Sequence, residues 1–95
     1  MKRKYQCIVC KNGFSMSVQA SETAYCTPRN NTGPYSSVEV GYPSMREELL
    51  MEWAETPSDP TETVYGWVPS EIVWDVIIKN DGYESGELPP LVMGK

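Results

Sequence analysis

The stretch Phe14-Ser15-Met16-Ser17-Val18-Gln19-Ala20-Ser21 decides the fold, because its apolar and polar residues alternate without a break. A period of two over eight residues is typical of a β-strand that buries one face and exposes the other. Lys11-Asn12-Gly13 precedes this stretch, and Asn-Gly tolerates the positive φ angles of a tight hairpin turn. We therefore expect the short apolar run over residues 5–10 to form the other strand of a hairpin.

Two further strands are expected after this hairpin. Residues 37–42 and residues 63–68 are short runs rich in β-branched and aromatic side chains, which favour strands. Residues 22–37 hold two prolines, a glycine and several Asn and Ser residues, which is typical of a loop. Tyr65 and Trp67 are two positions apart in the later run, so both are expected to point to the same side of the sheet.

Two helices are expected, each following one of these strands. Ser44 and Glu47 have the spacing of a capping box, which predicts an α-helix that opens at Ser44 and ends before Pro57. Pro69 suits the first turn of a second helix, which is expected to end at about Asn80. The second helix is so rich in Ile and Val that we expect it to be covered on more than one side.

Together these elements predict an α+β fold. We expect a mainly antiparallel sheet of about four strands, with the two helices packed on one face. The chain has 95 residues, which suits a single domain over residues 1–95. From about residue 83 the proline and glycine content predicts an irregular C-terminal tail, in which Leu88, Leu91 and Val92 dock onto the body.

Composition excludes several classes of protein. Apolar residues make up 40% of the chain, which is too many for a disordered tail. No run of 18 apolar residues is present, and no apolar signal segment follows the basic start, so we expect a cytoplasmic protein without a membrane span. The sequence has no histidine, no Gly-rich phosphate loop and no G-x-S-x-G motif, and we therefore expect no enzymatic activity.

Charge is distributed unevenly along the chain. Residues 1–38 carry five basic side chains and one acidic one, whereas residues 39–95 carry three basic and twelve acidic ones. Such an acidic surface repels nucleic acid and attracts a basic protein surface, although solubility alone would explain the same charge. The candidate partner-binding residues follow the charge spacing of a phosphate backbone, with an aromatic anchor beside them: Glu48, Glu52, Glu55, Asp59, Glu62 and Trp67, or Trp53 if that indole is exposed.

A small anionic ligand, such as a signalling nucleotide, is the alternative partner. The polar face of the alternating strand and the loop after it supply hydrogen-bonding groups, tyrosines and one arginine that could hold a phosphate. An outer sheet face exposed to solvent explains the same pattern. The candidate ligand-binding residues are Ser15, Ser17, Gln19, Tyr25, Arg29 and Tyr35.

Three cysteines raise a third possibility, a zinc-stabilised interaction module. Cys7, Cys10 and Cys26 supply three thiols, whereas a structural zinc site usually takes four ligands. The sequence Cys26-Thr27-Pro28-Arg29 offers no fourth ligand beside the third cysteine. We therefore expect no metal and no other cofactor, with the cysteines serving as small apolar residues.

The chain resembles small uncharacterised accessory proteins of tailed bacteriophages. The resemblance covers roughly residues 5–82 and lies in Gly13-Phe-Ser-Met-Ser-Val-Gln-Ala-Ser21, Tyr25-Cys-Thr-Pro-Arg29, Gly33-Pro-Tyr35, Val38-Glu-Val-Gly-Tyr-Pro-Ser44 and Val64-Tyr-Gly-Trp-Val-Pro69. It implies expression in the bacterial cytoplasm and no assigned site. Small acidic phage proteins of this kind often bind and block host defence or nucleic-acid-handling proteins, CRISPR interference machinery among them. The leading expectation is thus an anti-CRISPR-like inhibitor, of unknown oligomeric state.

Overall fold

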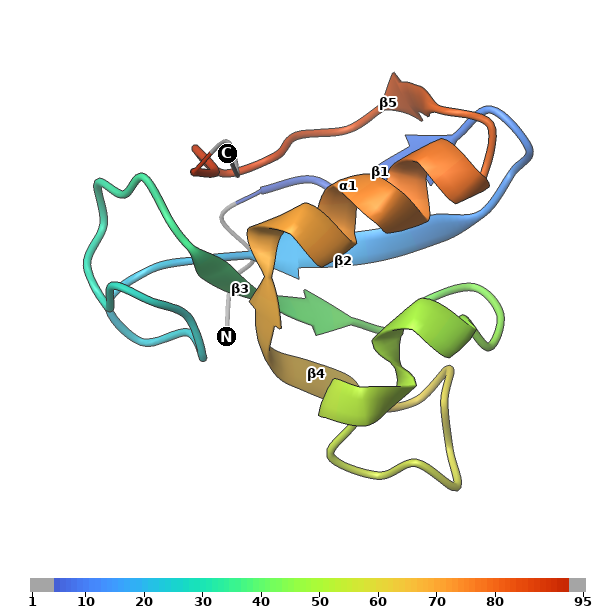
Figure 1. The fold of residues 1–95 in the computed structure, drawn as a ribbon, viewed down its shortest axis with the longest axis horizontal. Helices are drawn as coiled ribbons and strands as arrows, with labels where there is room; N and C mark the ends of the chain where they lie inside the picture. Colours follow the sequence, from blue (N-terminus) through green and yellow to red (C-terminus); the bar gives the residue numbers. More distant parts are fainter. Residues whose placement is uncertain (1–4, 93–95) are drawn as a thin grey trace.

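The computed structural model describes residues 5–92, and these residues form an α+β fold (Figure 1). Five strands make one antiparallel sheet in the order β4-β3-β2-β1-β5. A 3₁₀ helix, η1, and an α-helix, α1, follow β3 and β4 in the chain. The bounds are β1 Ile8–Cys10, β2 Ser15–Gln19, β3 Ser37–Gly41, η1 Glu48–Trp53, β4 Val64–Pro69, α1 Ser70–Lys79 and β5 Tyr83–Ser85. The predicted fold class is confirmed, with one strand more than expected.

The predicted hairpin forms the centre of the sheet. Ile8 pairs with Met16 across β1 and β2, and Gly13 takes a φ of 97° in the connecting turn. The four apolar residues of the alternating stretch are all buried, as the period of two predicts. They are Phe14, Met16, Val18 and Ala20.

Helix α1 lies across one face of the sheet (Figure 1) and closes the core with its buried Val73, Val76 and Ile77. The expectation that it is covered on more than one side is wrong for Ile78, whose side chain is 71% exposed. The Ile78 side chain points to solvent, because the helical period places it outside the row of residues that faces the sheet. Among the described residues no helix combines the length and the apolar character needed to cross a membrane.

The predicted first helix is not an α-helix opening at Ser44. Ser44 instead bonds to Ser15, with its N–H donating to the Ser15 carbonyl and its hydroxyl accepting from the Ser15 N–H. Farther on, Ala54 bridges to Tyr65 beside β4, so the chain is again extended there. Nine residues lie between Ser44 and Ala54, and the last six of them form η1. A short connection of this kind suits the tighter 3₁₀ helix.

The predicted irregular tail begins with a regular element. Tyr83 pairs with Cys10 and Ser85 with Val9, so β5 adds an edge strand to β1. Sequence pattern gives little sign of β5, because all three of its residues are exposed and one is an acid. The expectation that Leu88 and Leu91 dock onto the body is confirmed, since both pack against the core, whereas Val92 is exposed.

Candidate functional site

A β-bulge in β4 contains Trp67, the tryptophan with the most exposed side chain. Tyr65 pairs with Val40 and Val68 pairs with Val38, so Gly66 and Trp67 together oppose the single residue between those partners on β3. Trp67 takes a φ of 53°, a left-handed conformation that is rare for a bulky residue. The expectation that Tyr65 and Trp67 point to the same side is wrong, because the bulge inserts one residue: Tyr65 is fully buried and Trp67 is 47% exposed.

Trp67 is held in place by Tyr25 from the loop after β2. The two rings are stacked with their centroids 4.9 Å apart and 17° between their planes. The backbone N–H of Trp67 donates to the Tyr25 carbonyl at 3.0 Å, and the backbone N–H of Tyr25 donates to the Glu39 carboxylate at 2.9 Å. Gly66 leaves room for this arrangement, since a Cβ there would lie 3.4 Å from the Tyr25 Cβ. Backbone and ring contacts thus fix the indole together.

Arg29 completes what we call the aromatic cluster, defined as Tyr25, Arg29, Glu39 and Trp67. The Arg29 guanidinium carbon lies 5.9 Å from the centre of the Tyr25 ring, within the range of a cation–π contact. Its Nε donates to the Ala24 carbonyl at 3.1 Å. The cluster therefore joins one residue predicted to bind a partner, Trp67, with two predicted to bind a ligand. Sequence reasoning missed Glu39. Its position between Val38 and Val40 nevertheless predicts that its side chain points to the face of β3 opposite those two valines.

The other predicted ligand-binding residues do not form a free polar surface. Tyr35 is fully buried, and its hydroxyl donates to the Asn30 carbonyl. Ser17 is also buried and accepts from the Gln19 amide, whose nitrogen donates to Tyr5 O as well. Tyr35 and Ser17 are therefore unsuited to contact a ligand from solvent, and that part of the prediction is wrong. Ser17 pairs with Gly41 of β3 and its hydroxyl is bonded by the Gln19 amide, contacts that a period of two does not reveal.

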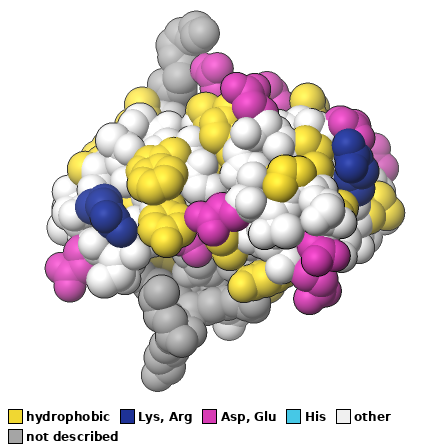
Figure 2. Space-filling model, turned by 90° about the horizontal axis from the view of Figure 1, so that it is seen from below, with side chains coloured by type: hydrophobic (Ala, Val, Ile, Leu, Met, Phe, Trp, Pro, Cys, Tyr) yellow, Lys and Arg dark blue, Asp and Glu magenta, His cyan; other side chains and the backbone are white. Residues whose placement is uncertain are grey.

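The predicted acidic residues all lie on the surface, but not as one helical stripe. Glu48, Glu52 and Glu55 share a face only at the period of an α-helix. At three residues per turn, Glu52 lies about 120° around the helix from Glu48. Glu48 is also paired with Arg46, whose hydrogen bond lowers the pKa of that carboxyl. In Figure 2 acidic side chains are scattered among hydrophobic and uncharged ones, so the negative charge is spread over this face.

The remaining predicted partner-binding residues lie at the end of η1 or in the loop after it. Asp59 and Glu62 are exposed on the loop between η1 and β4, where turn hydrogen bonds link their backbones. Trp53, the other candidate anchor, is only partly buried but packs against the core at the end of η1. Trp67 is therefore the indole that a partner can reach more easily.

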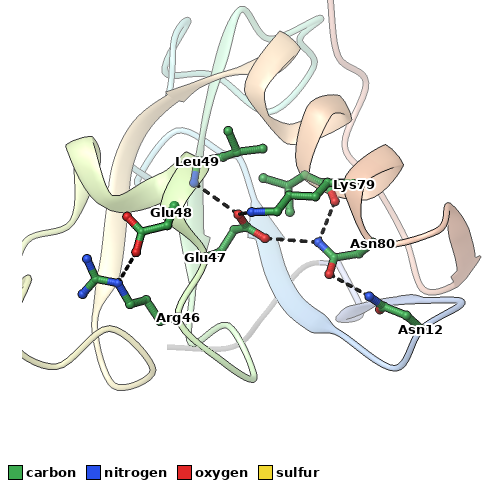
Figure 3. A network of polar contacts seen from close by, with 8 residues as sticks. Asn12, Arg46, Glu47, Glu48, Leu49, Lys79 and Asn80 are labelled. Atoms are coloured by element: carbon green, nitrogen blue, oxygen red, sulfur yellow. Dashed lines mark hydrogen bonds and ion pairs between the residues drawn. The ribbon is translucent and has the colours of Figure 1, made fainter.

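Glu47, which the sequence pattern placed in a capping box, has a different role. Its side chain is 4% exposed, and the carboxylate accepts from Lys79 Nζ at 2.6 Å, from Asn80 Nδ2 at 3.2 Å and from the Leu49 N–H at 3.2 Å (Figure 3). Asn12 then donates to Asn80 at 2.9 Å, which ties in the β1–β2 turn. Burial raises the pKa of Glu47, but the hydrogen bonds from Lys79, Leu49 and Asn80 outweigh it, and the pKa is lowered overall. Glu47 thus cross-links three segments.

The cysteines lie along the sheet and in the loop beyond it. Cys10 and Cys26 are buried in the core and Cys7 is half-buried, with no disulfide among them. The Cys26 thiol donates to the carbonyls of Ser21 and Pro28. Within residues 5–92, no group of three or more Cys, His, Asp or Glu side chains is placed to hold a metal ion.

The chain matches no protein-family model, no curated protein and no solved structure.

Proposed function

We propose that this protein is a non-enzymatic inhibitor that binds a host protein, with Trp67 as the anchor and the exposed acidic residues as the source of attraction. The partner class is a host defence or nucleic-acid-handling protein with a basic surface, and the setting is that of a phage accessory protein. The observation that carries the proposal is the exposed Trp67 indole, held at a φ of 53° against Tyr25.

The conformation of Trp67 supports a binding role. A non-glycine residue in the left-handed region costs roughly 1–2 kcal/mol, and such strain clusters at functional sites. A glycine at this position would avoid that cost, and a polar residue would avoid exposing an indole. Tryptophan is among the residues most often found to dominate binding energy at protein interfaces. Because Tyr25 already orders the ring, little side-chain freedom is lost when a partner covers it.

Electrostatics support a basic partner. The chain has a net charge of −5, and Glu52, Glu55, Asp59 and Glu62 are all exposed. Spread-out negative charge speeds the encounter with a positively charged surface and makes the association rate depend on salt. Long-range attraction of this kind speeds the encounter, and the aromatic cluster would supply the close contacts that hold the complex together.

The experiment is a capture from host lysate at low and high salt, followed by affinity measurement on the identified partner. Trp67→Ala is expected to weaken binding by about 10-fold to 100-fold, the range of a hot-spot residue. Charge reversal of Glu52, Glu55 and Glu62 to lysine is expected to lower the association rate and its salt dependence. Met45→Ala is the matched control, because Met45 is exposed and apolar but lies outside the cluster. Equal affinity for Trp67→Ala and the native protein overturns the proposal.

A second candidate, a binding protein for a small anionic ligand such as a nucleotide, is favoured by Arg29. Its guanidinium lies beside the Tyr25–Trp67 stack, so a base could stack on the open indole while Arg29 meets a phosphate. Thermal-shift measurements with a panel of nucleotides test this function. A stabilisation that Arg29→Ala removes supports it, and no stabilisation by any nucleotide sets it aside.

A further inference from the structure

The turn between β1 and β2 contains a chemically labile pair of residues. Asn12 is followed by Gly13, and both are exposed to solvent. An asparagine side chain can react with the next backbone nitrogen, and a glycine at that position has no Cβ to shield the nitrogen. A Cβ built on Gly13 would meet no atom within 4 Å, so the surrounding space is open as well. The other asparagines, Asn30, Asn31 and Asn80, all precede residues that carry side chains.

Hydrogen bonds fold the Asn12 side chain over the peptide that would react with it. Its Oδ1 accepts from the Phe14 N–H at 2.9 Å, and this bond closes a ring that contains the Gly13 nitrogen. If that nitrogen adds to Asn12 Cγ, negative charge develops on Oδ1, and the N–H already bonded there stabilises it as an oxyanion-hole donor does. The opposing contact is the bond from the Gly13 N–H to the Cys10 carbonyl. Because the turn is short and exposed, we expect this bond to open often.

The nitrogen of the Asn12 amide ties the same turn to the end of α1. It donates to Asn80 Oδ1 at 2.9 Å (Figure 3). Asn80 is 6% exposed, and its own Nδ2 donates to the Glu47 carboxylate and to the Val76 carbonyl. Both of those partners are acceptors, so the Asn80 amide cannot turn over, and its Oδ1 stays directed at the turn. That oxygen needs a donor, which an asparagine at position 12 supplies and an ionised aspartate does not.

We propose that Asn12 is a site of spontaneous deamidation, and that the product releases the hairpin turn from α1. The Gly13 nitrogen loses its proton to hydroxide and bonds to Asn12 Cγ. The Cγ–Nδ2 bond then breaks, and the leaving nitrogen takes a proton from water and departs as ammonia. Water adds to the resulting cyclic imide: addition at Cγ gives aspartate, and addition at the backbone carbon gives isoaspartate, whose main chain runs through Cγ. The net reaction consumes one water and releases one ammonia.

Either product disturbs the contact with Asn80. An aspartate keeps an acceptor for the Phe14 N–H but places a carboxylate oxygen against Asn80 Oδ1, where two acceptors repel each other. An isoaspartate adds one carbon to the main chain between β1 and β2, which are paired with each other in the sheet. In both cases Asn80 holds Glu47 less firmly. The site is separate from the aromatic cluster, so its test does not decide the function proposed above.

The test keeps the full-length protein at physiological temperature and pH in water enriched in the heavy oxygen isotope, and maps its peptides by mass spectrometry at timed intervals. We expect Asn12 to convert at least about 10-fold faster than any other asparagine, to take up one solvent oxygen and to yield isoaspartate among its products. Gly13→Ala should slow this conversion at least about 10-fold, because its Cβ shields the nitrogen. Gly82→Ala is the matched control, since Gly82 also combines a positive φ with an open Cβ position, and it should not slow the conversion.

A second measurement follows the consequence of the reaction. Asn12→Asp should speed amide hydrogen exchange several-fold at Lys11 and at position 12, whose N–H groups donate to the Gly82 and Asn80 carbonyls. Asn31→Asp adds the same charge at an exposed residue of the loop after β2 and should leave that exchange unchanged. Three results would each overturn the proposal: conversion of Asn12 in urea-unfolded protein but not in folded protein, a Gly13→Ala rate equal to the native rate, or equal exchange in Asn12→Asp and Asn31→Asp.

Discussion

The indole of Trp67 lies flat against the ring of Tyr25, at 4.9 Å between centroids, although the two residues belong to separate segments of the chain. Trp67 belongs to β4, and Tyr25 to the loop after β2. Three further contacts hold them together: the backbone hydrogen bond between them, the bond from Tyr25 to Glu39, and the close approach of Gly66. The stack therefore braces the edge of the sheet while it leaves the Trp67 side chain partly exposed.

Substitutions at Trp67 should show an unusual order of stability. Trp67→Gly is expected to be more stable than Trp67→Ala by about 1 kcal/mol, because glycine adopts a φ of 53° without strain. Both variants lose the stacking energy of roughly 0.5–1.5 kcal/mol. Urea unfolding measures the difference. The same pair of substitutions at Val64, a β4 residue whose φ is not positive, is the control, and there alanine should be the more stable. The same order at both positions would contradict the strain assigned to Trp67.

Much of the fold could be predicted from sequence, because its central elements carry a local signal. Alternation over Phe14 to Ala20 identified β2 and its buried face, and Asn12-Gly13 identified the hairpin. Helix α1 was predictable from Pro69 and a long apolar stretch. Elements set by contacts between distant segments were not. Ser44 bonds to β2 and Glu47 to α1, and these contacts override a capping-box pattern that local spacing supports equally well.

The candidate site was harder to predict for a related reason. Trp67 and Arg29 each stood out by residue type, but they were assigned to different partners, since nothing local shows that Tyr25 joins them. The bulge depends on pairing across β3 and β4, which a period of two cannot reveal. Glu48 and Glu52 would share one face at the period of an α-helix, but the segment forms a 3₁₀ helix, which turns them apart.

Gly86 should be among the least replaceable residues of the sheet edge. A Cβ there would lie 2.1 Å from the Cys7 carbonyl oxygen, and its φ of 109° is itself unfavourable for other residues. Gly86→Ala is expected to cost about 2 kcal/mol or more and to speed amide exchange in β5. Gly82→Ala is the matched control: its φ is 96° but no atom lies within 4 Å of the added Cβ, so only about 1 kcal/mol should be lost. Equal costs would contradict the close approach to Cys7.

Thiol reactivity should distinguish the three cysteines. Burial raises the pKa of Cys10, which lowers the fraction of reactive thiolate, and Cys26 is buried as well. Half-buried Cys7 is therefore expected to react with iodoacetamide at least about 10-fold faster than the other two in the native state. Mass spectrometry of peptides at timed intervals measures this, with urea-unfolded protein as the reference in which all three react. Protection of all three that a chelator removes would instead indicate a shared metal.

The buried Glu47 carboxylate should make stability depend on pH. Its pKa is lowered in the folded protein, so its stabilising contribution is present above the unfolded-state value of about 4.3 and is lost as the pH falls through the folded-state value. Glu47→Gln is expected to reduce the free energy of unfolding by about 1–2 kcal/mol near neutral pH, because a neutral amide cannot form the ion pair with Lys79. The difference should shrink as the native protein is taken toward low pH.

Urea unfolding at several pH values measures this difference, and the neighbouring Glu48 provides its control. Glu48 also has a lowered pKa through its bond to Arg46, but both side chains are more than half exposed, so solvent screens the pair. Glu48→Gln should therefore leave the free energy of unfolding close to that of the native protein at every pH. A Glu47→Gln difference that stays constant down to low pH, or that Glu48→Gln reproduces, would show that charge at Glu47 does not hold η1 against α1. A narrowing difference confined to Glu47 assigns the pH dependence to the contacts from Lys79, Asn80 and the Leu49 N–H.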